Sequence, residues 1–348
     1  IIILYMKFLT TGCCGFIGSN FINFMCQKYP EYHFYNIDKI DYCSNTKNVE
    51  EHSNYTFVYG NVCDYDLIKY ILNENSIDVV VHFAAQSHVD NSFGNSISFT
   101  KDNVLGSHTL LEACREYNKL HRFVHISTDE VYGEVDLDHS GCTEKSLLNP
   151  TNPYAATKAG AEFLVRSYYH SYKLPTMIIR GNNVYGPNQY PEKLIPKFIM
   201  HLLNNEKCTI HGKGESRRNF IYVDDVCSAV DIVLQKGIVN EIYNIGTNNE
   251  YTVLDIFYKL CQELVPKDNP KDYLQFVEDR CFNDFRYCID SSKLKELGWE
   301  EKTSFEDGFQ NTIKHYVENV NEYKKRIESS YKTTLAKTLS ISRNLQAL

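Results

Sequence analysis

A tyrosine and a lysine four residues apart could carry a proton transfer in this chain. Tyr154 and Lys158 form a Y-x-x-x-K pattern in a predicted helix, and residues four apart share one helix face. An ammonium group beside a phenol favours the phenolate and lowers a pKa that is ordinarily about 10. The tyrosine could then take a proton from a hydroxyl group while a hydride leaves the same carbon. The pair alone is weak, because the chain has 26 tyrosines, and it gains weight from the glycine motif described below.

Two neighbouring acids form a second reactive group. Asp129 and Glu130 follow Thr128 at the end of a predicted strand, and ligands of open α/β sheets bind at the carboxyl ends of strands. A dehydration needs a base for a carbon acid and an acid for the departing hydroxyl, and two carboxyl groups can divide these roles if their environments separate their pKa values. Taken alone, the acids indicate a solvated loop; with Thr128 and the Tyr154 pair they indicate a reactive site.

Three glycines predict a dinucleotide site. Gly12, Gly15 and Gly18 have G-x-x-G-x-x-G spacing between a predicted strand and a predicted helix. They would allow a tight turn, close approach of the backbone to a pyrophosphate, and packing of helix on strand, with the helix N-terminus facing the phosphate charge. Asp38 follows Gly18 by 20 residues, where a carboxylate can bind both ribose hydroxyls and repel a 2′-phosphate. The pattern favours NAD over NADP, and the alternative is a glycine turn without a cofactor.

The elements that would position these groups alternate between strand and helix. Strand patterns cover Ile1–Leu9, His33–Ile37, Tyr55–Tyr59, Ile77–Phe83, Arg122–Ser127 and Thr176–Arg180. Helix patterns cover Gly15–Lys28, Asp64–Leu72, Thr100–Tyr117 and Pro153–Tyr172. Apolar runs such as Val79–Val81 suit strands that are covered on both faces. The alternation predicts an α/β fold with a doubly wound parallel sheet of the Rossmann type.

A smaller second domain is expected in the later part of the chain. Beyond Gly186 the alternation of strand and helix patterns becomes less regular. Prolines occur at Pro187, Pro191 and Pro196, and a tight glycine turn is predicted at Gly212–Gly214. We predict an NAD-binding Rossmann domain over residues 1–182, with returns at about 220–247. A mixed α/β, substrate-binding domain over 183–328 is interleaved with it. Residues 329–348 are read as a polar tail without acidic residues.

The composition narrows the range of partners. A net charge of −8 over 348 residues argues against nucleic acid or an anionic membrane as the main partner, because a polyanion site needs clustered lysine and arginine. The apolar N-terminus lacks the features of a secretory signal and is too short for a membrane span. The twelve cysteines contain no C-x-x-C spacing, so we expect free thiols in a reducing cytoplasm. No residue is assigned to a metal.

Six motif blocks carry a family resemblance. They are Thr11–Gly18, Phe83–Asp90, Thr128–Gly133, Asn152–Lys158, Arg180–Pro187 and Gln189–Pro196. Together they resemble the extended short-chain dehydrogenase/reductase superfamily and, within it, the nucleotide-sugar 4,6-dehydratases of the dTDP-glucose and UDP-glucose type. The resemblance covers about Lys7 to Tyr316. Sugar-nucleotide 4-epimerases have small or hydroxyl residues where this chain has Asp129 and Glu130, so the acid pair favours a dehydratase.

The resemblance implies a role for each catalytic residue. Thr128 hydrogen-bonds the sugar, and Tyr154, supported by Lys158, deprotonates O4 while hydride passes from C4 to NAD⁺. Glu130 then removes the C5 proton, Asp129 protonates the C6 hydroxyl that leaves as water, and the hydride returns to C6. The implied products are an NDP-4-keto-6-deoxyhexose and water, as in rhamnose-type deoxysugar biosynthesis. NAD⁺ is regenerated and should stay bound.

The resemblance also implies the binding residues. Those expected to bind the cofactor are Gly12, Gly15, Phe16, Ile17, Gly18, Asp38, Lys39, Asn61, Val62, Ala84, Ala85, Ser87, Tyr154, Lys158 and Val184. Those expected to bind the nucleotide-diphosphate hexose are His88, Thr128, Asn183, Lys193, Leu194, Pro196, Thr209, His211, Arg218, Asn249 and Arg280. The two arginines suit a diphosphate because guanidinium binds oxyanions bidentately. Each could instead form a surface ion pair, and His88 could be an ordinary buried histidine.

Departures from the family pattern leave the nucleotide base of the substrate undecided. Asn61 stands where the bacterial dTDP-glucose enzymes have an acidic residue. The resemblance implies that this replacement alters a contact to the adenine of the cofactor. Arg280–Asn283 replaces their Arg-Pro-Gly-His segment. Asn283–Tyr287 resembles eukaryotic members, including the dehydratase part of plant rhamnose synthases, which act on UDP-glucose. The sequence therefore does not decide between UDP and dTDP.

The sequence leaves two alternative functions and predicts a quaternary structure. A nucleotide-sugar epimerase or decarboxylase would use the same scaffold, but Asp129 and Glu130 count against both. A non-catalytic NAD-binding module would not need the intact catalytic set.

By analogy with the superfamily, a homodimer is expected to pair through the helices at Thr100–Tyr117 and Pro153–Tyr172.

Overall fold

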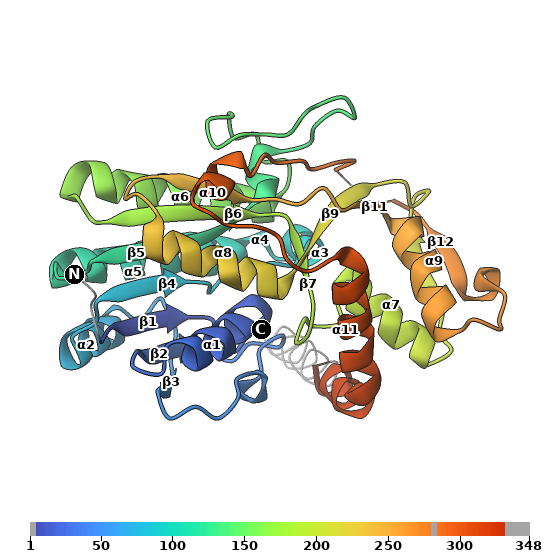
Figure 1. Ribbon diagram of the computed structural model, residues 1–348, viewed down its shortest axis with the longest axis horizontal. Coiled ribbons are helices and arrows are strands. Elements are labelled where there is room, and N and C mark those ends of the chain that lie inside the picture. The colour runs from blue at the N-terminus through green and yellow to red at the C-terminus, as the bar shows by residue number, and fades with distance from the viewer. Residues whose placement is uncertain (1–4, 280–283, 331–348) are drawn as a thin grey trace, which may run out of the picture.

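The main body of the protein is a seven-stranded sheet. The structure is a computed structural model that describes residues 5–279 and 284–330. Within these residues the sheet is parallel throughout and has the order β10-β6-β5-β4-β1-β2-β3 (Figure 1). Its strands are β1 (Lys7–Thr11), β2 (His33–Asp38), β3 (Tyr55–Tyr59), β4 (Val79–His82), β5 (Arg122–Thr128), β6 (Thr176–Gly181) and β10 (Ile242–Ile245). The order reverses between β1 and β4, and ligands of such sheets bind beside the carboxyl ends of the strands at the reversal. The predicted doubly wound Rossmann sheet is confirmed.

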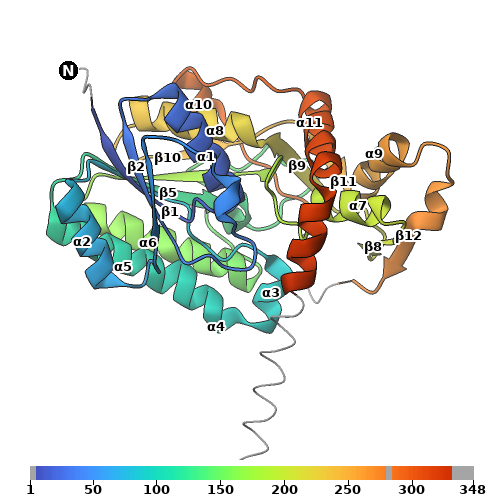
Figure 2. The same ribbon diagram turned by 90° about the horizontal axis from the view of Figure 1, so that it is seen from below.

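Helices cover both faces of this sheet. One face carries α1 (Phe16–Lys28) and α8 (Val223–Lys236), which pack on each other. The opposite face carries α2 (Tyr65–Asn75), α5 (Gly106–Tyr117) and α6 (Pro153–Tyr172), as Figures 1 and 2 show. None of the helices in the described ranges combines the length and the apolarity that crossing a bilayer requires.

Most element boundaries agree with the sequence, and two do not. The first strand begins at Lys7 instead of Ile1, and Tyr5 is 56% exposed; residues 1–4 lie outside the described ranges. The helix expected from Thr100 begins at Ser96, because α4 (Ser96–Phe99) and a wider π-helical turn, η2 (Thr100–Leu105), precede α5 without a break. Burial of Phe99 holds this first turn, and a short serine-rich run gives no periodic signal of it.

A smaller α/β part is interleaved in the chain with α8 and β10, the last elements of the main body. Its three-stranded sheet contains β7 (Asn183–Tyr185), β9 (Arg217–Tyr222) and β11 (Glu250–Thr252), and its two-stranded sheet contains β8 (Cys208–His211) and β12 (Leu274–Val277). Its longer helices are α7 (Leu194–Leu203), α9 (Val253–Leu264) and α11 (Phe305–Glu318). Besides α4 and η2, the short helices in the described ranges are η1 (Thr46–Asn48), α3 (Val89–Gly94), η3 (Asp129–Tyr132), η4 (Pro270–Tyr273) and α10 (Ser292–Glu296). A further helical segment covers residues 320–330, so positions 329 and 330 of the expected tail are helical, and 331–348 fall outside the described ranges.

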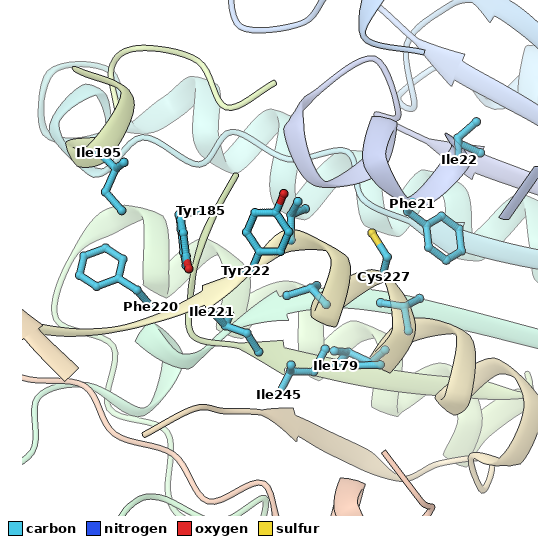
Figure 3. Packing of buried hydrophobic residues seen from close by; sticks show 14 of the residues in the cluster. Phe21, Ile22, Ile179, Tyr185, Ile195, Phe220, Ile221, Tyr222, Cys227 and Ile245 are labelled. Atoms are coloured by element: carbon cyan, nitrogen blue, oxygen red, sulfur yellow. The ribbon is translucent and has the colours of Figure 1, made fainter. Parts of the chain in front are cut away.

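The two parts share one hydrophobic core. A single cluster runs from α1 across the sheet to β9 and α7, as Figure 3 shows for Phe21, Ile179, Ile221 and Ile195. A separate cluster fills the opposite face under α2, α5 and α6. Because each fully buried aliphatic or aromatic side chain contributes about 1.5–3 kcal/mol, the shared cluster holds the smaller part firmly against the sheet.

A buried ion pair joins α6 to the sheet. Arg180 on β6 donates to Glu162 on α6 through Nη2 at 2.5 Å, and the two side chains are 2% and 1% exposed. Arg180 also donates to the hydroxyl of Tyr132 at 2.7 Å, and that hydroxyl donates to Asn244 at 2.9 Å. Such a pair is tolerated in the core only because nearly every donor and acceptor has a partner.

Removing the acid of this pair should destabilise the protein strongly. Glu162→Gln leaves the Arg180 charge buried without its counter-ion, and we expect a loss of about 3–5 kcal/mol in the free energy of unfolding, measured by urea titration. Glu318→Gln, which removes the exposed partner of Lys314 on α11, is the matched control and should cost less than about 1 kcal/mol. Equal losses for both variants would contradict the assigned role of the pair.

Candidate active site

A pocket opens at the carboxyl ends of β1, β2 and β4. It is lined by fourteen of the fifteen residues predicted for the cofactor, namely Gly12, Gly15, Phe16, Ile17, Gly18, Asp38, Lys39, Asn61, Val62, Ala84, Ala85, Ser87, Tyr154 and Lys158. Val184 is not among the lining residues. It lies in β7, where it pairs with Ile221 of β9, because the chain turns away from the main sheet after β6.

The glycine turn packs too closely on its own neighbours for side chains, and it leads into an uncapped helix N-terminus. Gly12 has φ +74°, and a Cβ there would lie 2.5 Å from the Cα of Ala84. A Cβ on Gly18 would lie 2.7 Å from the Cα of Cys13. No side chain caps the N-terminus of α1 at Gly15, so its first N–H groups are suited to an anionic group. These features fit the pyrophosphate of a dinucleotide.

Asp38 is held by the backbone at the end of β2. It is 6% exposed, and its two oxygens accept from the N–H groups of Cys14 at 3.0 Å and Ile40 at 2.8 Å. Burial raises the pKa of this carboxyl, and the two N–H groups act to lower it. Each oxygen keeps a lone pair that can accept a further hydrogen bond, so the expected binding of ribose hydroxyls stays a prediction.

A polar network beside Asp38 was missed from the sequence. Lys39 Nζ lies 2.6 Å from Asp102 and 3.3 Å from Asp41, and Gln86 Nε2 donates to both carboxylates at 2.8 Å. All four residues line the pocket. Asp102 comes from η2, about sixty positions later in the chain, so no local pattern could have paired it with Lys39.

The acid pair lies at the end of β5 in two different hydrogen-bond environments. Thr128 Oγ1 donates to Asp129 Oδ1 at 3.2 Å and accepts from the N–H of Glu130 at 3.3 Å. Asn182 Nδ2 donates to Asp129 Oδ2 at 2.7 Å, whereas Asn152 Nδ2 donates to Glu130 Oε2 at 3.1 Å. Each acid therefore has its own asparagine. The block Asn152–Lys158 contains one of them and the block Arg180–Pro187 the other, but neither residue had been given a role.

Burial raises the pKa of both acids, and the groups that oppose this rise differ between them. Asp129 is 2% exposed, and burial together with the charge of Glu130 raises its pKa to about 7. Burial also raises the pKa of Glu130, which is opposed by Asn152 and by the positive charges of Lys193 and Arg218. Asp129 can therefore hold a proton near neutral pH, which suits a proton donor.

Tyr154 and Lys158 lie in the first turns of α6, where Asn152 caps the helix by accepting from the N–H of Ala155 at 2.9 Å. Tyr154 is close enough to the acids that the charges of Glu130 and Asp129 act on its pKa, and Thr128 acts on it through a hydrogen bond. The structure thus brings the phenol and the acid pair together, as the sequence predicts.

The structure does not show the lowered phenol pKa that was expected from Lys158. The pKa of Tyr154 is raised, first by burial and then by the charge of Glu130. The ammonium of Lys158 instead donates to the backbone oxygen of Ile126 at 2.6 Å. Burial lowers the pKa of Lys158 to about 8, and Glu162 opposes this shift. Desolvation of the whole cluster outweighs the attraction that sequence spacing suggested.

Several predicted substrate residues lie beside the acid pair or the pocket rim. Lys193 lines the pocket and donates to the backbone oxygen of Ser87 at 2.5 Å. His88 Nδ1 lies 3.9 Å from Glu192, and burial lowers the pKa of this histidine. The buried Nδ2 of Asn183 has no hydrogen-bond partner in the described part of the chain, so it can donate to a ligand.

Arg218 is held as a cation near the acids. Its guanidinium lies 4.8 Å from the ring centre of Tyr287, and Nη2 donates to the backbone oxygen of Asp284 at 2.9 Å. Its charge acts to lower the pKa of both Asp129 and Glu130. This position supports an anion-binding role on the same side of the cleft.

The remaining predicted substrate residues are not brought to the pocket lining. They are Leu194 and Pro196 in α7, Thr209 and His211 in β8, and Asn249 before β11. His211 Nδ1 lies 3.2 Å from the backbone oxygen of Glu278, and Asn249 Nδ2 donates to Glu301 at 2.8 Å. Arg280 falls outside the described residues.

Other lining residues had no role assigned from the sequence. They are Ile37, Asp41, Cys43, Ser44, Gly60, Phe83, Gln86, Asp102, Ile126, Ser127, Gln189, Tyr190 and Glu192. Phe83, Gln86, Gln189, Tyr190 and Glu192 lie inside the motif blocks, which was the available signal. Cys43 and Ser44 lie in a loop whose approach to the pocket depends on contacts with distant segments.

With this geometry in place, the chain can be compared with known proteins. Residues 9–312 match the family model described as GDP-mannose 4,6 dehydratase. The chain belongs to this family. A buried acid pair beside a Tyr/Lys pair and a glycine-rich dinucleotide pocket is in keeping with that membership.

Individual relatives are similar over nearly the whole chain. A trifunctional UDP-glucose 4,6-dehydratase/UDP-4-keto-6-deoxy-D-glucose 3,5-epimerase/UDP-4-keto-L-rhamnose-reductase of Arabidopsis thaliana is 50% identical over 315 residues, which are 89% of this chain and 47% of that protein. The chain thus spans about half the length of the first curated relatives it matches. The human dTDP-D-glucose 4,6-dehydratase is 45% identical over 325 residues, covering 91% of this chain and 92% of that protein.

A solved structure extends the similarity to three dimensions. The crystal structure of DesIV, a dTDP-glucose 4,6-dehydratase from Streptomyces venezuelae with NAD bound, matches with a TM-score of 0.87 at 37% identity. The match covers 92% of this chain and 100% of that one. It extends over both the main sheet and the smaller part.

Removing the asparagine that contacts Asp129 should raise the pKa of that acid. Asn182→Ala deletes a donor that favours the ionised form, and we expect the pKa of Asp129 to rise from about 7 by about one unit. The shift would be followed by ¹³C NMR titration of the carboxyl carbons, with Asp129→Asn to assign the signal. Asn219→Ala is the matched control, because Asn219 is also buried and donates to the backbone of Thr247. Equal shifts in both variants would refute the role of Asn182.

Proposed function

We propose that the protein is an NAD-dependent nucleotide-sugar 4,6-dehydratase, a hydro-lyase of rhamnose-type deoxysugar biosynthesis. It would convert an NDP-glucose, with UDP or dTDP as the nucleotide, to NDP-4-keto-6-deoxy-glucose and water. The observation that carries the proposal is the cluster of Asp129, Glu130 and Tyr154 beside the dinucleotide pocket. Family membership and the names of the relatives support it. An epimerase or decarboxylase on this scaffold would have no use for two desolvated acids at the end of β5.

The cofactor would be held by the glycine turn and by Asp38. When bound, NAD would accept a hydride from the sugar and return it within the same turnover, as a nicotinamide does. The backbone N–H groups at the start of α1 would bind the pyrophosphate, and the carboxylate of Asp38 would accept from ribose hydroxyls. On the substrate side, Arg218, Lys193 and Asn183 are proposed to bind the nucleotide diphosphate.

The chain's own groups would move three protons. Tyr154 Oη would take the proton of the sugar O4, with Thr128 orienting the sugar and Lys158 supporting the phenol. Glu130 would take the C5 proton, Asp129 would give its proton to the C6 hydroxyl as that group leaves, and Glu130 would return its proton to C5 when the hydride reaches C6. Tyr154 has then gained one proton and Asp129 has lost one, so proton exchange between them or with solvent restores both groups. Because the charge of Asp129 is one cause of the raised pKa of Tyr154, the protonated form of Asp129 also makes the phenolate easier to form.

The wider organisation follows the same proposal. Residues 1–182 with returns at about 220–247 would form the NAD-binding domain, 183–328 the substrate-binding domain, and 329–348 a polar tail.

A homodimer is supported by exposed apolar side chains on neighbouring helices of one face, Phe93, Ile97, Leu105 and Phe163, which a second copy would cover. A cytoplasmic location is supported by the free thiols, which suit a reducing compartment.

Dehydration should weaken as the pH rises above neutrality. Asp129 must be protonated to donate, and its pKa is about 7, so the competent fraction should fall about tenfold for each pH unit well above that value. Glu130 must be ionised, so the rate should also fall at low pH. The measurement is the rate at which NADH-loaded protein removes water from an NDP-4-keto-glucose, which needs no O4 deprotonation by Tyr154, as a function of pH. A profile that stays flat from pH 6 to pH 9 would contradict the assigned acid.

The central test offers UDP-glucose and dTDP-glucose separately to the purified protein, first without added NAD and then with it. We expect one or both to lose water, followed by mass spectrometry, and the comparison of rates reports the preferred base. If neither sugar nucleotide is converted with added NAD present, the proposal is wrong. Tyr154→Phe is the matched variant: it should retain NAD and lose at least about 10²-fold in kcat. Unchanged turnover in this variant would overturn the role of Tyr154.

A further inference from the structure

The helix at residues 320–330 lies at the rim of the dinucleotide pocket. Arg326 Nη2 donates to the backbone oxygen of Cys43 at 3.3 Å, and its guanidinium lies 5.4 Å from the ring centre of Tyr190. Cys43 and Tyr190 both line the pocket. In Figure 2 this red end of the described chain lies beside the blue segment that follows β2. One side chain of the helix therefore touches two separate parts of the pocket wall.

A second contact ties the helix to the glycine turn. Glu322 Oε1 accepts from Asn45 Nδ2 at 3.2 Å, and the N–H of Asn45 donates to the backbone oxygen of Cys14 at 2.8 Å. Cys14 lies between the first two glycines of the turn. The loop that contains Cys43 and Asn45 is therefore held between the glycine turn on one side and the helix on the other.

The helix itself is firmly seated. Tyr323 is 3% exposed, its hydroxyl lies 3.0 Å from His315 Nε2, and its ring lies 4.6 Å from that of Tyr316. The hydroxyl of Tyr316 donates to the backbone oxygen of Gln189, next to Tyr190. Val320 and Ile327 pack against the main hydrophobic cluster. The helix can thus act as a fixed support for the two loops.

These contacts matter because the supported segments are loops. Residues 39–45 and 187–193 contain neither strand nor helix, so their positions depend on side-chain contacts. Both contribute to the pocket wall, and outward movement of either would open a path for a bound dinucleotide. The family match ends at residue 312, so the helix lies beyond the part of the chain that identifies the family.

We propose that residues 320–330 are part of the dinucleotide site and that Arg326 is a positioning residue that slows release of NAD. Arg326 would hold Tyr190 and the Cys43 loop against the bound cofactor, with Glu322 and Asn45 as the second tie. The inference rests on the NAD assignment in the proposed function. A reaction that regenerates NAD in every turnover does not need to release it, so a pocket that is closed in this way suits that chemistry.

The test measures release of a prebound dinucleotide from the full chain. Wild type, Arg326→Ala, Arg326→Lys and Lys325→Ala are loaded with NADH, excess NAD⁺ is added, and the loss of protein-bound NADH fluorescence is followed. Arg326→Ala should release NADH about tenfold faster, because it loses a cation–π contact and a charged hydrogen bond. Arg326→Lys should restore part of the retention. Lys325→Ala changes an exposed residue of the same helix and should match wild type.

The outcomes separate this inference from the proposed function. Equal release rates for wild type and Arg326→Ala overturn the role of the helix, and so does an equal acceleration in Lys325→Ala. Thermal unfolding of each variant reports whether the fold is intact. If Arg326→Ala does not fold, Asn45→Ala cuts the second tie: faster release supports the proposal, and an unchanged rate overturns it. Failure of wild type to bind NADH would overturn the cofactor assignment together with this inference.

Discussion

The arrangement of this protein depends on how charge is buried. Arg180 and Glu162 form an ion pair in the core between β6 and α6, and the hydroxyl of Tyr132 extends it to η3. A charge in such surroundings is stable only with a nearly complete set of partners, so α6 and η3 cannot shift independently. Since α6 carries Tyr154 and η3 carries Asp129, the pair in the core sets the distance between phenol and acid in the site.

The same constraint governs the chemistry of the site. Asp129, Glu130 and Tyr154 form one desolvated cluster in which each negative charge makes the next one more costly. Neutral donors stabilise the acids directly: Asn182 for Asp129 and Asn152 for Glu130. The positive charges of Lys193 and Arg218 lower the pKa of Glu130, and that of Arg218 also lowers the pKa of Asp129. The pKa of both acids nevertheless stays raised. The result is an acid that can hold a proton next to one that is better stabilised as an anion.

The dinucleotide pocket is assembled from segments that are far apart in the chain. The glycine turn and Asp38 come from the first forty residues, Asp102 from η2, Tyr190 from the loop before α7, and the outer support from residues 320–330. Regular elements hold the inner wall, whereas the outer wall consists of loops that are fixed by side-chain contacts. The outer wall is only partly marked by sequence motifs: Tyr190 lies inside the block Gln189–Pro196, whereas Cys43 and residues 320–330 lie outside the six blocks.

The sequence by itself determined the sheet, the glycine turn and the short blocks that carry the acid pair and the Tyr154/Lys158 pair. These features depend on neighbouring residues: helix α6 begins where predicted because Asn152 and Pro153 start it locally, and the glycine spacing encodes a turn within seven residues. Tertiary structure alone decided the raised pKa of Tyr154, the pairing of Lys39 with Asp102, the asparagine beside each acid and the contact of Arg326 with Tyr190. It also placed Val184 and Asn249 away from the pocket lining. The physical reason is that desolvation and long-range contacts depend on which distant segments meet, and no local pattern records that.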